Sequence, residues 1–427
     1  MPRNAPAAVR EGPRRCPSLP PELLDNIHDR LGFLDRIAFA AVFAASCGSD
    51  DNVFKPSRPW LLLPGKTTET VELFSVRDRR AATVRASDPT LRGHFVVLGS
   101  SRGWLATADE LGQIYLVNPA TGEQHALPHI ATMGVFNDCR WPHDSFTVRV
   151  RCFLTIRYGR GPPFLDSSLG REGYGGYSFA LNYMFYRKVV LSPRRPGSYG
   201  TAMLILWDVF GTPAFATAED GVWKLARSED GVEDAIHHDG QFYSVSYSGV
   251  VEVWQRDAES GEYTSTAVTP RLAIEEASSC RPLKYLVAAP GGQLMVVLKY
   301  GRVTKKRYDR EGWTCSFKVH VLGDDGQWNE TRDIGAVALF VGVNNSLCVP
   351  TRGRPEIEAG CVYFTDDRLR GVRKQYYSLW DDDDVDVRAV GVYSLKDGTL
   401  KKMEALGQEY NRCRFLPPPV WITPSIP

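Results

Sequence analysis

Apolar residues in the first part of the chain recur at the spacing of a helix. Four of them fall on one predicted helical face: Leu23, Leu24, Ile27 and Leu31. Pro20 and Pro21 suit the start of that helix, where a missing N–H costs little, and Gly32 suits a left-handed C-terminal cap. The pattern therefore predicts a first helix that ends at Gly32.

A second helix is expected directly after the first. Asp35 can cap it by accepting backbone N–H bonds, and Gly48 can end it. Its apolar positions are Ile37, Phe39, Val42 and Phe43. Two helices of about a dozen residues do not stabilise themselves in water, so their apolar faces need a partner. That partner is either the rest of the chain or another protein.

After Pro56 the pattern changes to that of β-strands. Short runs of Val, Ile, Tyr, Phe and Trp alternate with turns of Gly, Asp, Asn and Pro. An alternating strand followed by a polar Gly turn recurs at residues 113–122, 250–261, 317–326 and 390–398. The last three copies, centred on residues 253, 319 and 392, lie 66 and 73 residues apart. Such loose spacing is typical of degenerate four-stranded propeller blades.

The two patterns together predict the fold class and its division. We expect a mainly β protein: a leader at residues 1–15, a helical segment at 16–55, and a β-propeller of six or seven degenerate blades at 56–424. The leader is expected to be disordered. Two packed β-sandwiches are the structural alternative.

Composition excludes several classes of function. Lys plus Arg total 51 and Asp plus Glu total 50, so the formal charge of +1 predicts no nucleic-acid partner. Nine cysteines without a Cys-x-x-Cys pair predict neither a disulfide framework nor a zinc site. The longest apolar run, Ala38–Cys47, is too short to span a membrane, and the leader lacks an apolar signal region. We therefore expect a protein of the nucleus, the cytoplasm or both, with no cofactor and no metal.

Three short motifs suggest chemistry but are better explained by structure. Residues 99–103 match Gly-x-Ser-x-Gly, yet the hydrolase elbow needs a following helix and another strand is expected here. His237 and His238 are neighbours in a predicted strand and would point to opposite faces, before a tight turn at Asp239-Gly240. Asp381–Asp384 lacks the alternation of a calcium loop. No catalytic residue is predicted, and we expect the protein not to be an enzyme.

The N-terminal string Leu19-Pro20 … Leu23-Leu24 … Ile27 … Leu31 … Leu34-Asp35-Arg36 resembles an F-box. Further strings follow in order, among them Gly99–Leu105, Lys188–Ser192, His238–Tyr243, Val362–Asp367 and Trp421–Pro424. Together they resemble the plant F-box proteins whose C-terminal β-propeller is the domain of unknown function 295, or KIB-type, family.

The resemblance implies a substrate-recognition subunit of a Skp–cullin–F-box ubiquitin ligase, acting in ubiquitin-dependent degradation. Its helices would dock onto the Skp-type adaptor, and through it onto the cullin complex, while the propeller binds an unknown protein target. The implied adaptor-binding residues are Leu19, Pro20, Leu23, Leu24, Ile27, Leu31, Leu34, Ile37 and Val42. An F-box usually ends with Val-Cys-x-x-Trp, but here Phe43 and Ser46 stand at the Cys and Trp positions. This departure keeps open a propeller scaffold or inhibitor without ligase coupling.

Overall fold

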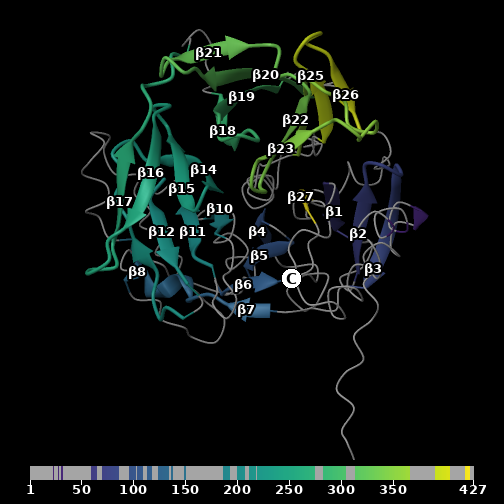
Figure 1. Cartoon of the computed structure of the whole chain (residues 1–427). Coiled ribbons are helices and arrows are strands. Elements are labelled where there is room, and N and C mark those ends of the chain that lie inside the picture. Colours follow the sequence, from purple (N-terminus) through teal and green to yellow (C-terminus); the bar gives the residue numbers. More distant parts are fainter. Residues whose placement is uncertain are drawn as a thin grey trace, which may run out of the picture.

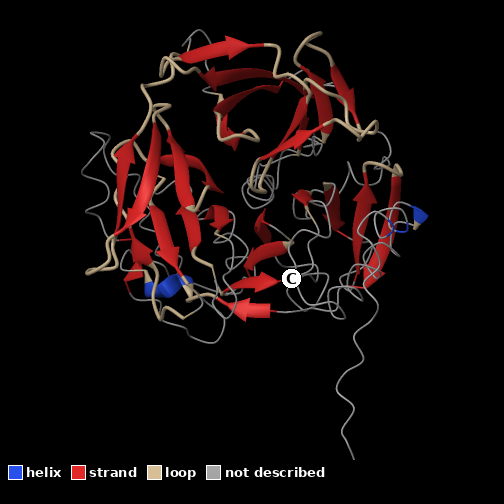
Figure 2. Ribbon diagram, viewed as in Figure 1, coloured by secondary structure: helices blue, strands red, loops and turns tan. Residues whose placement is uncertain are grey.

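The computed structural model describes Leu23, Ile27, Arg30, Leu31 and most of residues 59–423. The gaps in the latter range are residues 65–69, 86–95, 102, 109–112, 118–123, 134–135, 138–148, 151–185, 193–199, 207–210, 218, 275–281, 304–312, 366–389 and 404–418. The described elements are strands, apart from a 3₁₀ turn, η2 (Ile130–Thr132), and the helical positions Leu23, Ile27 and Arg30 (Figure 2). The mainly β prediction is thus confirmed.

Six sheets, here named blades 1 to 6, form a ring (Figure 1). Blade 1 contains β27 (Val420–Ile422), β1 (Trp60–Pro64), β2 (Thr70–Ser75) and β3 (Arg80–Arg85). Blade 2 contains β4 (Val96–Ser101), β5 (Trp104–Ala108), β6 (Ile114–Val117) and β7 (Gln124–Ala126). Blade 3 contains β10 (Tyr186–Leu191), β11 (Ala202–Leu206), β12 (Pro213–Ala216) and β13 (Lys224–Leu225).

The second half of the ring is built in the same way. Blade 4 contains β14 (Val232–His238), β15 (Gln241–Ser246), β16 (Val251–Arg256) and β17 (Tyr263–Ala267). Blade 5 contains β18 (Leu283–Ala288), β19 (Leu294–Val303), β20 (Trp313–Leu322) and β21 (Trp328–Thr331). Blade 6 contains β23 (Leu347–Pro350), β22 (Val337–Val341), β24 (Cys361–Phe364), β25 (Gly391–Ser394) and β26 (Leu400–Lys402). A separate hairpin joins β8 (Phe136–Asn137) to β9 (Arg149–Val150).

The recurring sequence pattern marks equivalent strands of different blades. Its four copies contain β6, β16, β20 and β25, each of which pairs with the outermost strand of its blade. The turn after β25 resembles one in blade 1: Ser394 Oγ donates to Asp397 at 2.8 Å, as Ser75 Oγ does to Asp78 at 2.7 Å between β2 and β3. Alternation and turn residues are local signals, which is why the sequence alone places these strands.

Neighbouring blades pack through apolar side chains. The described residues form six hydrophobic clusters, one at each junction between successive blades. Between blades 3 and 4, for example, Phe215 stacks on Tyr263 with ring centroids 3.8 Å apart. This arrangement confirms a propeller, fixes the blade count at six, and shows that the two-sandwich alternative is wrong.

Blade 1 closes the ring with strands from both ends of the propeller sequence. β27 pairs antiparallel with β1, so that Trp60 lies opposite Ile422. Trp421 is fully buried and packs edge-to-face on Phe340 of blade 6, with ring centroids 5.0 Å apart. The closure is therefore held by hydrogen bonds within blade 1 and by aromatic packing onto blade 6.

Candidate functional site

Three of the nine predicted adaptor-binding residues fall within the described part of the chain. Leu23 and Ile27 are helical and lie one turn apart, with 48% and 37% of their surface exposed. Leu31 is half-buried in a bend. The other six lie outside the described residues: Leu19, Pro20, Leu24, Leu34, Ile37 and Val42. The described apolar residues of the predicted docking face are thus at least partly open to solvent.

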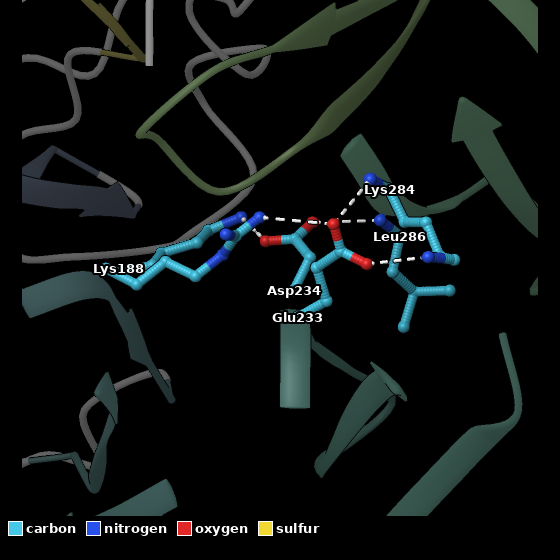
Figure 3. A network of polar contacts seen from close by, with 6 residues as sticks. Lys188, Glu233, Asp234, Lys284 and Leu286 are labelled. Carbon is cyan, nitrogen blue, oxygen red and sulfur yellow. Dashed lines mark hydrogen bonds and ion pairs between the residues drawn. The ribbon is translucent and has the colours of Figure 1, made fainter. Parts of the chain in front are cut away.

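A buried polar cluster lies among the first strands of blades 3, 4 and 5. It depends on an irregularity in β14, where the register with β15 shifts between Val232 and Asp234 and leaves Glu233 without a partner in the ladder. Adjacent residues of a regular strand point to opposite faces, but a bulge re-aims its side chains. Both Glu233 and Asp234 are thereby available to neighbouring blades (Figure 3).

Asp234 links blade 4 to both neighbouring blades. Lys188 Nζ of β10 lies 2.6 Å from Asp234 Oδ1, and the backbone N–H of Leu286 in β18 donates to Asp234 Oδ2 at 2.8 Å. Lys188 and Asp234 are each only 2% exposed. These two contacts fix the buried carboxylate between β10 and β18.

Glu233 makes a parallel set of contacts. Lys284 of β18 donates from Nζ to Glu233 Oε2 at 2.7 Å and from its backbone N–H to Oε1 at 3.2 Å. Arg187 Nη2 of β10 lies 3.8 Å from Oε1. Figure 3 shows the two carboxylates between the blade 3 and blade 5 cations. The cluster, which we call the inner ion network, therefore ties three blades together by charge-assisted hydrogen bonds.

The inner ion network holds blades together, and its carboxylates are not placed to act on a substrate. Each carboxylate is engaged by a lysine ammonium and a backbone N–H, so neither faces an open space where a substrate could bind. Within the described ranges, no group of three or more His, Cys, Asp and Glu side chains is placed to hold a metal ion. Sequence reasoning missed this network, because only the three-dimensional arrangement unites its residues.

The Gly-x-Ser-x-Gly match is a hairpin turn, as predicted. β4 ends at Ser101 and β5 begins at Trp104, which lies opposite Ser101 in the antiparallel ladder. Gly103 has a φ of 82°, which favours glycine. The hydrolase elbow needs a helix after the serine, and a strand stands there instead.

The turn after the two histidines is also confirmed. Asp239 and Gly240 have φ values of 44° and 79°, and they join β14 to β15 as a two-residue hairpin. His237 packs edge-to-face on Phe242, whereas His238 Nε2 lies 3.3 Å from Asp239 Oδ2. The histidines therefore serve separate contacts. Asp381–Asp384 lies outside the described residues.

The described part of the chain contains no helix that is both long and apolar enough to cross a membrane. Two of its cysteines, Cys348 and Cys361, are free thiols.

Comparison with known proteins decides the family. Residues 73–394 match the model of the KIB1-4 beta-propeller, which is three quarters of the chain. The chain belongs to the KIB1-4 β-propeller family. The family resemblance expected from the sequence is thereby confirmed.

A relative and two solved structures complete the comparison. An Arabidopsis thaliana protein described as "Putative F-box protein" is 30% identical over 115 residues, which are 26% of this chain and 30% of that protein. The alignment thus spans less than a third of this relative. The N-terminal domain of Nup159 matches with a TM-score of 0.30 and 10% identity, over 82% of this chain and 76% of that one. The Cps50 (Swd1) β-propeller of Myceliophteria thermophila matches with a TM-score of 0.29 and 9% identity, over 73% and 86%. At such scores these likenesses carry no argument, and the fold rests on the strand order.

Proposed function

We propose that this KIB1-4 propeller is a substrate receptor of a Skp–cullin–F-box ubiquitin ligase in the nucleus or cytoplasm. The observation that carries the proposal is the pair Leu23 and Ile27, one turn apart on a helix and both exposed. Similarity to an F-box protein supports it. Exposed apolar residues at helical spacing are suited to burial against another protein.

In the proposed role the chain supplies position and other subunits supply chemistry. The helices would bury their apolar face against the Skp-type adaptor, and the propeller would hold the target. Holding two reactants together replaces a bimolecular encounter by an effectively unimolecular one. The contribution of this chain to the rate of ubiquitin transfer would then come from the two binding events.

The test is co-purification of the full-length chain with a co-expressed plant Skp-type adaptor. Wild type is expected to retain the adaptor, and Leu23→Asp or Ile27→Asp is expected to lose it, because either places a charge in an apolar interface. Val268→Asp is the matched control: Val268 is 45% exposed but lies after β17, on blade 4. Failure of wild type to retain the adaptor would refute the proposal.

A second candidate is a propeller scaffold or inhibitor without ligase coupling. It is favoured by Phe43 and Ser46, which occupy the positions where an F-box usually has Cys and Trp. The same experiment separates the two, with residues 1–55 present or deleted. Retention by neither form supports the scaffold, whereas equal retention by both would place the adaptor contact outside residues 1–55.

A further inference from the structure

A pocket of about 530 Å³ lies where blade 5 meets blade 6. Its volume falls within the range of about 300–1,000 Å³ that is usual for ligand sites. The ends of β19, β20, β22 and β23 contribute to its wall, together with the loop between β18 and β19. The pocket is distinct from the predicted adaptor-docking helix and from the inner ion network.

The lining of the pocket is mainly apolar, with Gln293, Asn329, Thr331 and Asp333 as its polar members. Met295, Val321 and Ile334 line it and also belong to the hydrophobic cluster between blades 5 and 6. Met295 is 3% exposed, whereas Val321 and Ile334 are only partly covered by the rest of the chain. An apolar side chain from another molecule would therefore extend the interblade core and be removed from water.

Two prolines line the pocket. Pro290 stands on the blade 5 side and Pro350 on the blade 6 side. Proline fixes its own φ and has no N–H to donate, so neither residue offers a backbone donor.

Asp333 is the charged residue among those that line the pocket. Its Oδ1 accepts the N–H of Gly335 at 2.9 Å, and the residue is exposed. Arg354 is not among the lining residues, and its Nη1 donates to the carbonyl oxygen of the lining residue Pro350 at 2.8 Å. The carboxylate of Asp333 lies beside an apolar floor. A ligand that carries a cationic group next to an apolar group would match both.

We propose that this pocket binds a short peptide segment of the target, with an apolar side chain on Met295, Val321 and Ile334 and an adjacent Lys or Arg paired with Asp333. The inference deepens the proposed function, since the peptide belongs to the protein that the receptor would present. Peptide binding itself does not require the adaptor. The apolar contact and the ion pair with Asp333 contribute separately to peptide affinity, so single substitutions can distinguish them.

The experiment selects a phage-displayed library of random 12-residue peptides on the full-length chain. An enriched sequence is then synthesised with a fluorophore, and its binding is measured by anisotropy. We expect enriched peptides to share Leu, Met or Phe next to Lys or Arg. Asp333→Asn should weaken binding by about 2–5-fold, as loss of an exposed ion pair does. Ile334→Glu should weaken it by about tenfold or more, because a carboxylate would enter the apolar floor.

The test includes a control variant and a check that each variant is folded. Glu259→Gln removes an exposed acid on the blade 4 turn and should leave peptide affinity unchanged. Each variant should keep the circular dichroism spectrum and melting temperature of wild type within about 3 °C. No enrichment, enrichment of peptides without a basic residue, or equal affinity for Ile334→Glu and wild type overturns the assignment.

The outcome is independent of ligase coupling. Ile27→Asp should bind the selected peptide as wild type does. Adaptor retention without peptide binding overturns the pocket assignment alone, whereas peptide binding without adaptor retention overturns the ligase proposal alone.

Discussion

Lys188→Met tests the inner ion network by removing one charge and little volume. Lys188 Nζ lies 2.6 Å from Asp234 Oδ1, and both side chains are 3% exposed. The substitution leaves a buried carboxylate that keeps the N–H of Leu286 but loses its ammonium. Breaking a buried pair in this way costs about 3–5 kcal/mol. Since a whole domain is stable by about 5–15 kcal/mol, the variant should be strongly destabilised.

An exposed pair in the same molecule provides the control. Lys318 Nζ lies 3.0 Å from Glu330 Oε2 across β20 and β21, with the side chains 40% and 43% exposed. Solvent screens this pair, so Lys318→Met should cost between about 0 and 1 kcal/mol. The two variants remove the same group at similar distances, and only burial differs.

A double variant separates loss of the pair from loss of packing. In Lys188→Met/Asp234→Asn the amide oxygen can still accept from Leu286, and no charge is left buried. It should be more stable than Lys188→Met alone by about 1–3 kcal/mol. Urea unfolding followed by tryptophan fluorescence at pH 7 gives these free energies. The reasoning is refuted if Lys188→Met costs no more than Lys318→Met, or if the double variant is no better than the single one.

Three further substitutions have defined outcomes. Gly99→Ala should lower stability by about 1–3 kcal/mol in a urea titration, because its Cβ would lie 2.1 Å from the carbonyl oxygen of Val189. Trp421→Ala should lower the free energy of unfolding by about 3–5 kcal/mol and broaden the thermal transition, because it removes a fully buried indole at the point where the ring of blades closes. Burial raises the pKa of the Glu252 carboxyl, so the folded chain holds that proton to higher pH than the unfolded chain. Tighter binding of this proton by the folded chain stabilises the fold. The stabilisation is complete at pH values below the pKa of Glu252 in the unfolded chain, and it is lost as pH rises through the pKa in the folded chain. Glu252→Gln should therefore be more stable than wild type at pH 7 by less than about 1 kcal/mol and equal to it near pH 4, as melting temperatures across pH would show.

Local signals made the strands and turns predictable. The alternating pattern around residue 253 became β16, and the Asp239-Gly240 pair became a two-residue hairpin, because both depend on neighbours in sequence. Blade 6 was less regular: β22 pairs in parallel with β24, while β23 folds back along the other edge of β22. This additional strand lies within the 73-residue interval between the last two copies, which is longer than the 66-residue interval before it.

The inner ion network could not be predicted because its partners are far apart in sequence. Lys188 lies 46 positions before Asp234, and Lys284 lies 51 positions after Glu233. In the sequence each looks like an ordinary charged residue beside an apolar run, which usually means a solvated face. The bulge that re-aims Glu233 leaves no local mark in the sequence. The same holds for the pocket, whose lining comes from strands of two blades.

Ring closure relates the two proposed surfaces to each other. The described propeller begins with β1 at Trp60, and β1 is fixed by β27 from the other end of the propeller sequence. Trp421 of β27 then packs on Phe340 of blade 6, the blade that also forms one side of the pocket. Close-packed interiors transmit displacement instead of absorbing it. A target segment bound between blades 5 and 6 would therefore be held rigidly with respect to the strand that follows the docking helices, as a receptor that works by proximity requires.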